Sequence, residues 1–178
     1  FDLRAGDIRD ATVVTVLGDD GGSMTDLNRE AITAAETAAA DEWREILKQV
    51  EISGPPESMP VLNALKTAFA HMMITREGPA LRPGPRSYAR SWIRDGAMMS
   101  ESFLRLGHNK PAVDFARWYA PYQFSSGKVP CCVDKRGADP VVENDSHGEL
   151  IFLIGDTYRD TGDRTFAEAM WPYADKAA

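Results

Sequence analysis

The chain has 178 residues, of which 43% are hydrophobic, enough for one ordinary domain with a core of its own. Its formal net charge is -7, and it lacks a basic stripe with interleaved aromatic residues, which argues against a nucleic-acid or anionic-membrane partner. No apolar run approaches the roughly 20 residues that a membrane-spanning helix needs. Because the sequence starts at Phe1 rather than Met, it leaves a cytoplasmic and a secreted location equally open.

The first part of the chain predicts a strand followed by a long helix. Residues 11–17 are apolar and β-branched and precede a Gly-rich turn, so we expect residues 1–24 to be the tail of a β-rich domain. The composition then becomes rich in Ala and Glu, with Thr25 or Asp26 available as a helix cap. Residues 25–56 are therefore expected to form a linker helix.

The rest of the chain, residues 57–178, predicts helices separated by Pro- and Gly-rich segments. Helices are expected over residues 60–74, over residues 93–106, from Pro111 onward, from Ser146 to Gly162, and after Asp163. In the helix expected from Pro111 onward, one face is expected to consist of Ala112, Phe115, Ala116 and Tyr119. Two long loops, residues 76–87 and 121–145, precede helices and are long enough to indicate a function.

A weak internal sequence repeat indicates that these helices form pairs. Gly107 and Gly162 each end a helix and precede a second helix with a similar apolar pattern. Stacked helical hairpins of this kind form solenoids or closed α/α toroids. The apolar run from Leu150 suits an inner helix buried on both sides, and Ser146 and Glu149 have the spacing of a capping box at its start.

Stacking of the hairpins would bring two polar clusters to one rim. They consist of Tyr88, Arg90, Trp92, Arg94 and Asp95, and of Lys128, Asp134, Asp139, Glu143, Asp145 and His147. Aromatic rings stack on sugar faces, and Arg and Asp side chains bind hydroxyl groups through paired hydrogen bonds. Carboxylate pairs supply the acid and the base for glycosidic cleavage. The rim is therefore a candidate carbohydrate site.

Short motifs in these clusters resemble those of a known family. The run Trp92-Ile93-Arg94-Asp95 resembles the Trp-x-Arg-Asp signature of (α/α)6 glycoside hydrolases, such as glucoamylases, trehalases, processing α-glucosidases and glycogen-debranching glucosidases. Residues 143–149 are similar to the acidic, Gly-containing segment that opens a later inner helix in such enzymes, and residues 127–130 resemble the Gly-x-x-Pro loop before it. The resemblance covers about residues 60–171.

This resemblance implies an all-α fold that forms part of an (α/α)6 toroid, and hydrolysis of an α-linked glucoside or oligosaccharide by inversion, without metal or organic cofactor. Its candidate catalytic residues are Asp145 and Glu143. Its candidate substrate-binding residues are Tyr88, Arg90, Trp92, Arg94, Asp95, Lys128 and His147. Because six hairpins need a longer chain, we expect an incomplete toroid whose general base, and whose activity, depend on the remainder of the same polypeptide.

Other interpretations stay open. Arg94 and Asp95 could be a structural ion pair, Asp145 a favourable charge at a helix start, and Glu149 the capping partner of Ser146. The whole chain could belong to another toroid enzyme, such as a sugar phosphorylase, an epimerase or a terpenoid cyclase. It could also be a non-catalytic carbohydrate-binding helical module.

The sequence offers little sign of metal or thiol chemistry. His147 lies among the carboxylates of the second cluster, but their spacing fits no standard metal-ligand motif, so no metal site is predicted. The two cysteines, Cys131 and Cys132, are neighbours, and a disulfide between neighbours is strained and rare. They are predicted to be two partly buried thiols.

Overall fold

The computed structural model describes residues 4–7, 13 and 28–178. The strand expected over residues 11–17, and the caps expected at Thr25 and Asp26, therefore lie outside the described residues, apart from Val13. The chain divides into two compact units, Phe1–Glu42 and Trp43–Ala178.

The long helix expected in this part of the chain is present as α1 (Arg29–Lys48), which is shorter than the predicted range 25–56. It starts after Asn28, whose Oδ1 accepts a hydrogen bond from the backbone N–H of Ala31 at 2.8 Å and so caps the first turn. None of its residues is buried. Ile46 and Leu47, near its C-terminal end, are partly buried against the hydrophobic core, and the Ala- and Glu-rich composition favours the helix along the rest of its length.

The second unit is mostly helical, so the expected all-α class is confirmed. In chain order it contains η1 (Pro56–Ser58), α2 (Met59–Ile74), η2 (Arg86–Tyr88), β1 (Ser91–Trp92), α3 (Ile93–Arg105), α4 (Asn109–Tyr119), η3 (Ala120–Tyr122), β2 (Cys132–Asp134), β3 (Gly137–Ala138), α5 (Ser146–Thr161) and α6 (Arg164–Ala177). Across the described part of the chain, no helix is both long enough and apolar enough to cross a membrane.

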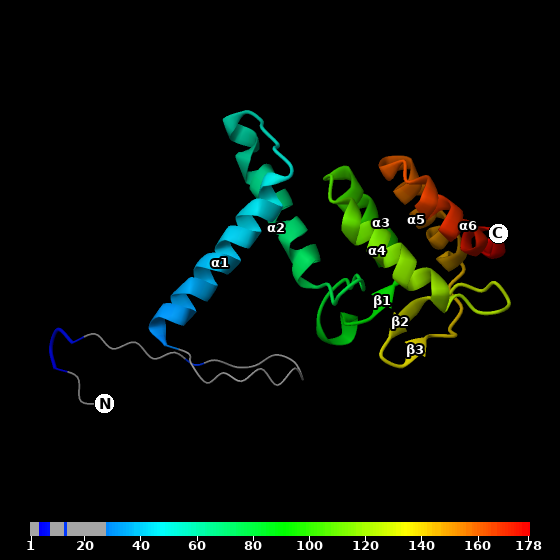
Figure 1. The fold of residues 1–178 in the computed structure, drawn as a ribbon, viewed down its shortest axis with the longest axis horizontal. Helices are drawn as coiled ribbons and strands as arrows, with labels where there is room; N and C mark the ends of the chain where they lie inside the picture. The colour runs from blue at the N-terminus through cyan, green and yellow to red at the C-terminus, as the bar shows by residue number, and fades with distance from the viewer. Residues whose placement is uncertain (1–3, 8–12, 14–27) are drawn as a thin grey trace. The chain divides into compact units, whose positions relative to one another are not determined.

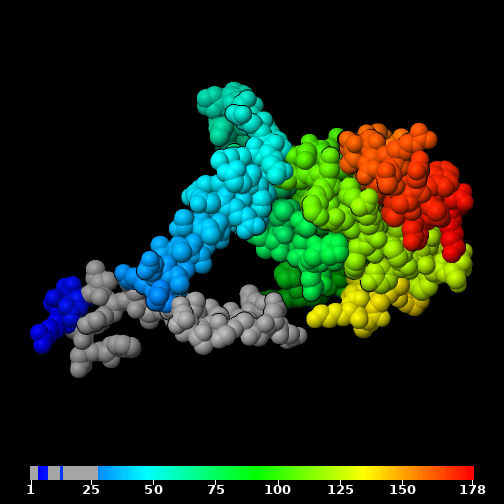
Figure 2. All heavy atoms as spheres, in the orientation of Figure 1, coloured from blue at the N-terminus to red at the C-terminus, as the bar shows by residue number. Residues whose placement is uncertain are grey.

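Two helical hairpins, α3–α4 and α5–α6, form the body of this unit (Figure 1). Helix α3 packs against α4 and α5, and α5 packs against α6 and α4. In Figure 2 the side chains fill the spaces seen between these ribbons. The hairpin repeat expected from the sequence is thus present as two adjacent pairs.

The ends of these helices follow the expected chemistry. The glycines after α3 and α5, Gly107 and Gly162, have φ angles of 72° and 65°, the left-handed conformation that lets a helix stop without a clash of a side chain. Asp163 Oδ1 accepts a hydrogen bond from the N–H of Phe166 at 3.0 Å and caps α6. The expected buried face of α4 is also confirmed, since its four residues have no exposed surface. They are Ala112, Phe115, Ala116 and Tyr119.

A small antiparallel sheet, which the sequence interpretation had as loops, connects the hairpins. Its order is β1-β2-β3, with Trp92 opposite Cys132 and Asp134 opposite Gly137. Strands of two or three residues are too short to show an alternating pattern, so periodicity could not reveal them. The sheet joins the segment that precedes α3 to the loop that precedes α5.

Two expectations about α5 were wrong. The capping box does not form: Ser146 is already helical, and its buried Oγ has no hydrogen-bond partner within the described residues. The preceding residue, Asp145, is the N-cap residue, but its side chain makes no capping hydrogen bond. The helix is also not buried on both sides, because Ile151 and Phe152 are 37% and 39% exposed. In this structure α5 therefore has one buried face.

The close contact between α3 and α4 depends on a glycine that directly follows the Trp92–Asp95 motif. A Cβ atom at Gly96 would lie 2.1 Å from Cζ of Phe115, whose ring is completely buried. We predict that Gly96→Ala lowers the free energy of unfolding by about 1–3 kcal/mol, because the ring has no space to move into. Urea unfolding monitored by circular dichroism measures this difference.

The matched control is Gly155→Ala in α5, where a Cβ atom would meet nothing within 4 Å. This variant should be neutral or more stable, since Ala favours a helix over Gly by about 0.5–1 kcal/mol. Equal unfolding midpoints for the two variants would contradict the proposed packing of Gly96.

Candidate functional site

The starts of α3 and α5 are joined by one arginine. Arg94, in the first turn of α3, donates a hydrogen bond from Nε to Asp145 Oδ2 at 2.5 Å and another from Nη2 to Glu143 Oε2 at 3.2 Å. These three residues, here the Arg94 cluster, retain side-chain exposures of 47% for Arg94, 29% for Glu143 and 40% for Asp145. A ligand can therefore reach them from solvent.

Two carboxyl groups near the start of α5, those of Asp145 and Glu149, have pKa values shifted in opposite directions. The hydrogen bond from Arg94 lowers the pKa of Asp145, so this carboxylate is ionised at neutral pH and is poorly suited to donate a proton. One turn further along α5, the pKa of Glu149 is raised, first by burial and then by the negative charge of Asp145. Glu149, which sequence reasoning had assigned to capping, is thus the better proton donor at this end of α5.

A second arginine holds the sheet together beside the cluster. Arg90 Nη2 donates to Asp139 Oδ2 at 2.6 Å, and Arg90 Nε lies 2.8 Å from Asp134 Oδ2. The pKa of Asp139 is lowered chiefly by Arg90, and the pKa of Asp134 chiefly by the hydrogen bonds from Arg136 and then by Arg90. Both carboxylates are committed to these arginines, so Arg90 acts here mainly in positioning the segment that leads to Trp92.

An aromatic pair lies beside Arg90. The rings of Tyr88 and Trp92 have centroids 6.0 Å apart, and the guanidinium of Arg90 lies 5.6 Å from the ring centre of Trp92. Tyr88 is 62% exposed, whereas the backbone of Trp92 is fixed by its pairing with Cys132. A partly rigid aromatic surface of this kind can stack on a sugar ring.

Three of the residues predicted from sequence lie apart from these contacts. Asp95 is half-buried and lines a separate cavity of about 300 Å³ together with His71 and Arg82. Lys128 donates a hydrogen bond to the carbonyl of Pro140 and so fixes the loop after β3. The third, His147, is half-buried in the first turn of α5 and forms no hydrogen bond or ion pair with any residue that the structure describes.

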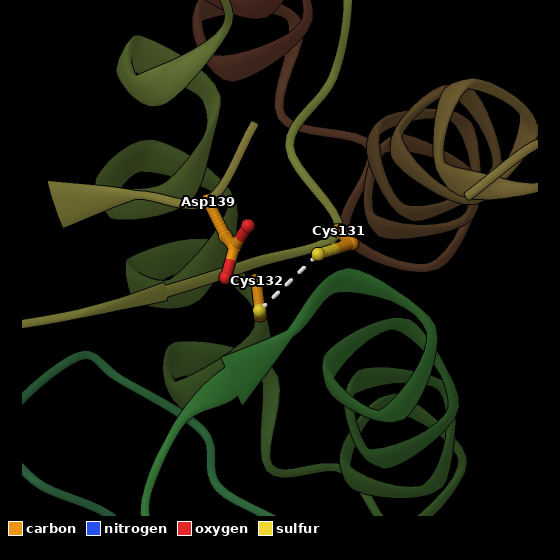
Figure 3. A group of neighbouring side chains, drawn as sticks. All are labelled: Cys131, Cys132 and Asp139. Atoms are coloured by element: carbon orange, nitrogen blue, oxygen red, sulfur yellow. Dashed lines mark hydrogen bonds between the residues drawn. The ribbon is translucent and has the colours of Figure 1, made fainter. Parts of the chain in front are cut away.

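The adjacent cysteines lie at the start of β2, next to Asp139 (Figure 3). Cys131 and Cys132 are 3% and 1% exposed, so they are buried rather than partly buried, and their Sγ atoms are 3.3 Å apart. Burial raises the pKa of Cys132 to about 12. The two sulfur atoms and a carboxylate oxygen of Asp139 lie within 4.8 Å of one another. This is a candidate cation-binding group that motif spacing did not reveal.

The carboxylate in this group already has other partners. Asp139 Oδ2 accepts a hydrogen bond from Arg90, and Oδ1 accepts one from the backbone N–H of Val141 at 3.0 Å. A cation bound by the two cysteines and Asp139 would therefore compete with Arg90 or with the N–H of Val141 for a carboxylate oxygen. In the arrangement seen here the group serves the packing of the sheet.

The functional candidates are thus the Arg94 cluster, the Tyr88–Trp92 pair and Glu149, all near the starts of α3 and α5. Charged hydrogen-bonding groups beside an exposed aromatic surface suit a ligand with several hydroxyl groups. In the comparisons with known proteins, no family model, no curated protein and no solved structure matches this sequence.

Proposed function

We propose that this chain is the sugar-binding part of a glycoside hydrolase of the (α/α)6-toroid type, acting on an α-linked glucoside or oligosaccharide. The Arg94 cluster is the observation that supports this most strongly. It unites the two sequence segments that resemble the family, although Arg94 and Asp145 are 51 positions apart in the chain. In a toroid, α3 and α5 would be successive inner helices, with α4 and α6 in the outer ring.

The proposed binding mode follows from the unused hydrogen-bonding groups of the cluster. The carboxylate oxygens that do not face Arg94 can accept hydrogen bonds from adjacent hydroxyls of a terminal sugar, and Arg94 retains further N–H donors for a ring or hydroxyl oxygen. Trp92 and Tyr88 would stack on the apolar face of the sugar. Several such weak contacts together determine the orientation of the substrate.

The proposed cleavage step uses the contrast in pKa between two carboxyl groups. Glu149, whose pKa is raised by burial, would donate its proton to the glycosidic oxygen as the bond to the leaving group breaks. Asp145, ionised beside Arg94, would stabilise the positive charge that develops on the sugar ring. Glu143 remains the second candidate acid. In the inverting reaction, a base contributed by other residues of the same polypeptide would activate the attacking water.

The binding role is tested by Arg94→Gln in the complete polypeptide. We predict that the rate of glucose release from maltotetraose falls by about a hundredfold, because loss of one charged substrate contact costs about 3 kcal/mol in the transition state. The melting temperature should change little, since an exposed ion pair contributes at most about 1 kcal/mol.

Arg105→Gln is the matched control, because Arg105 forms an exposed ion pair with Glu101 on the same helix. It should leave the rate unchanged. If Arg94→Gln retained activity within a few-fold of the unaltered protein, the Arg94 cluster would be a structural ion pair and the proposal would be wrong.

The catalytic role of Glu149 gives a prediction about pH. A general acid must be protonated, so activity should fall as pH rises through the pKa of Glu149, which lies above its ordinary value of 4.5. Glu149→Gln should lower kcat by about a hundredfold or more and remove this alkaline limb from the pH–rate profile. Glu168→Gln, which removes an exposed glutamate of α6, is the control. An unchanged profile in Glu149→Gln would exclude Glu149 as the acid.

A further inference from the structure

A wide, positively charged cleft lies beside Arg90 in the second unit. Its volume is about 950 Å³, at the upper end of the range typical of ligand pockets, roughly 300–1,000 Å³. Two carboxylates, Glu77 and Asp134, line it. The cations that line it are Arg76, Arg82, Arg86, Arg90, Lys135 and Arg136. The positive charge is local, because the chain as a whole carries a net charge of -7.

The two carboxylates are already paired with cations of the cleft. Glu77 forms an ion pair with Arg82, and Asp134 is shared between Arg136 and Arg90. Neither carboxylate is therefore available to neutralise the other cations that line the cleft. The remaining charge therefore has to be balanced by solvent ions or by a ligand.

Three cations of the cleft lack a carboxylate partner within the described residues. Arg76 donates its hydrogen bonds to Met73 Sδ and to the carbonyl of Gly78, both uncharged groups. Arg86 and Lys135 are exposed, and no hydrogen bond or ion pair connects the side chain of either one to the described part of the chain. Positive charges gathered in a concave surface attract anions more strongly than the same charges spread over a convex one.

One of these cations is held in an unusual backbone conformation. Arg86 has a φ angle of 59°, the only positive φ among the described residues other than glycine. This conformation is costly for a residue with a Cβ atom, and such positions gather at binding sites. The carbonyl of Arg86 accepts a hydrogen bond from the N–H of Ala89, which closes η2, and Arg86 lines the cleft.

Arg90 lies between the cleft and the aromatic part of the proposed sugar site. Arg90 lines the cleft and also lies over the ring of Trp92. The cavity of Asp95 shares Thr75 and Arg82 with the cleft. The lining contains no aromatic side chain among the residues described, so the bases of a nucleic acid would find nothing to stack on.

We propose that this cleft binds the carboxylate groups of an acidic oligosaccharide, one that carries uronic acid residues next to the sugar held at the Arg94 cluster. The inference rests on the proposed function, since it extends the same bound chain of sugars. Guanidinium groups bind carboxylates through paired, charge-assisted hydrogen bonds, and Arg76 and Arg86 provide two that have no carboxylate partner in the described structure. The cleft thus determines which oligosaccharides the site accepts.

The test compares tetragalacturonate with the neutral maltotetraose by isothermal titration calorimetry on the full chain at low ionic strength. We expect tetragalacturonate to bind at least about tenfold more tightly, and added salt to remove the difference. Arg86→Gln combined with Lys135→Gln should weaken tetragalacturonate binding about tenfold and leave maltotetraose binding unchanged. Lys110→Gln combined with Arg164→Gln removes the same charge from exposed sites on α4 and α6 and should have no effect.

The outcomes separate this inference from the proposed function. If maltotetraose does not bind but tetragalacturonate binds and depends on Arg86 and Lys135, the cleft is supported and the neutral sugar site is not. If both sugars bind equally, or if the double variant leaves tetragalacturonate binding unchanged, the cleft inference is overturned. Inorganic phosphate is the third probe. If it binds as tightly as tetragalacturonate and with the same dependence, the cleft is a general anion site and the acidic-sugar assignment is wrong.

Discussion

The backbone pairing between β1 and β2 is the constraint on which the site depends. Trp92 lies opposite Cys132, and the N–H of Ile93, the first residue of α3, donates a hydrogen bond to the carbonyl of Cys131 at 3.1 Å. This fixes the start of α3 against the loop that leads into α5. The buried hydroxyl of Ser91 adds a hydrogen bond to the carbonyl of Leu81, which anchors the other side of the strand. The polar side chains around these strands owe their positions to this pairing.

The carboxyl groups near the site fall into two classes, those with lowered pKa values and one with a raised pKa. Arginines lower the pKa values of Asp134, Asp139 and Asp145, whereas burial raises that of Glu149. Glycosidic cleavage requires one carboxyl group that donates a proton and another that is ionised. The same arginines have different surroundings: Arg90 is largely occupied by its carboxylates, while Arg94 stays half-exposed. This difference makes Arg94 the better candidate for direct contact with a ligand.

Much of the helical fold could be predicted because its signals are local. The apolar spacing identified the buried face of α4, and Gly107, Gly162 and Asp163 marked helix ends through backbone conformation and capping. The sheet could not be predicted, because its strands have two or three residues and are stabilised by partners distant in the chain. The capping box failed because α5 already begins at Ser146, so that its hydroxyl lies inside the first turn and is buried without a hydrogen-bond partner among the described residues. The altered pKa of Glu149 likewise comes from burial, which spacing does not report.

The central claim is that the Arg94 cluster and Trp92 form a sugar site. Titration of the 15N-labelled chain with maltotetraose, followed by amide chemical shifts in NMR spectra, tests it most directly. The account predicts that the largest shifts fall in residues 92–95 and 143–149 and include the indole N–H of Trp92, because these groups surround the bound ring. Shifts confined to other parts of the chain, or no shifts at saturating sugar, would contradict it.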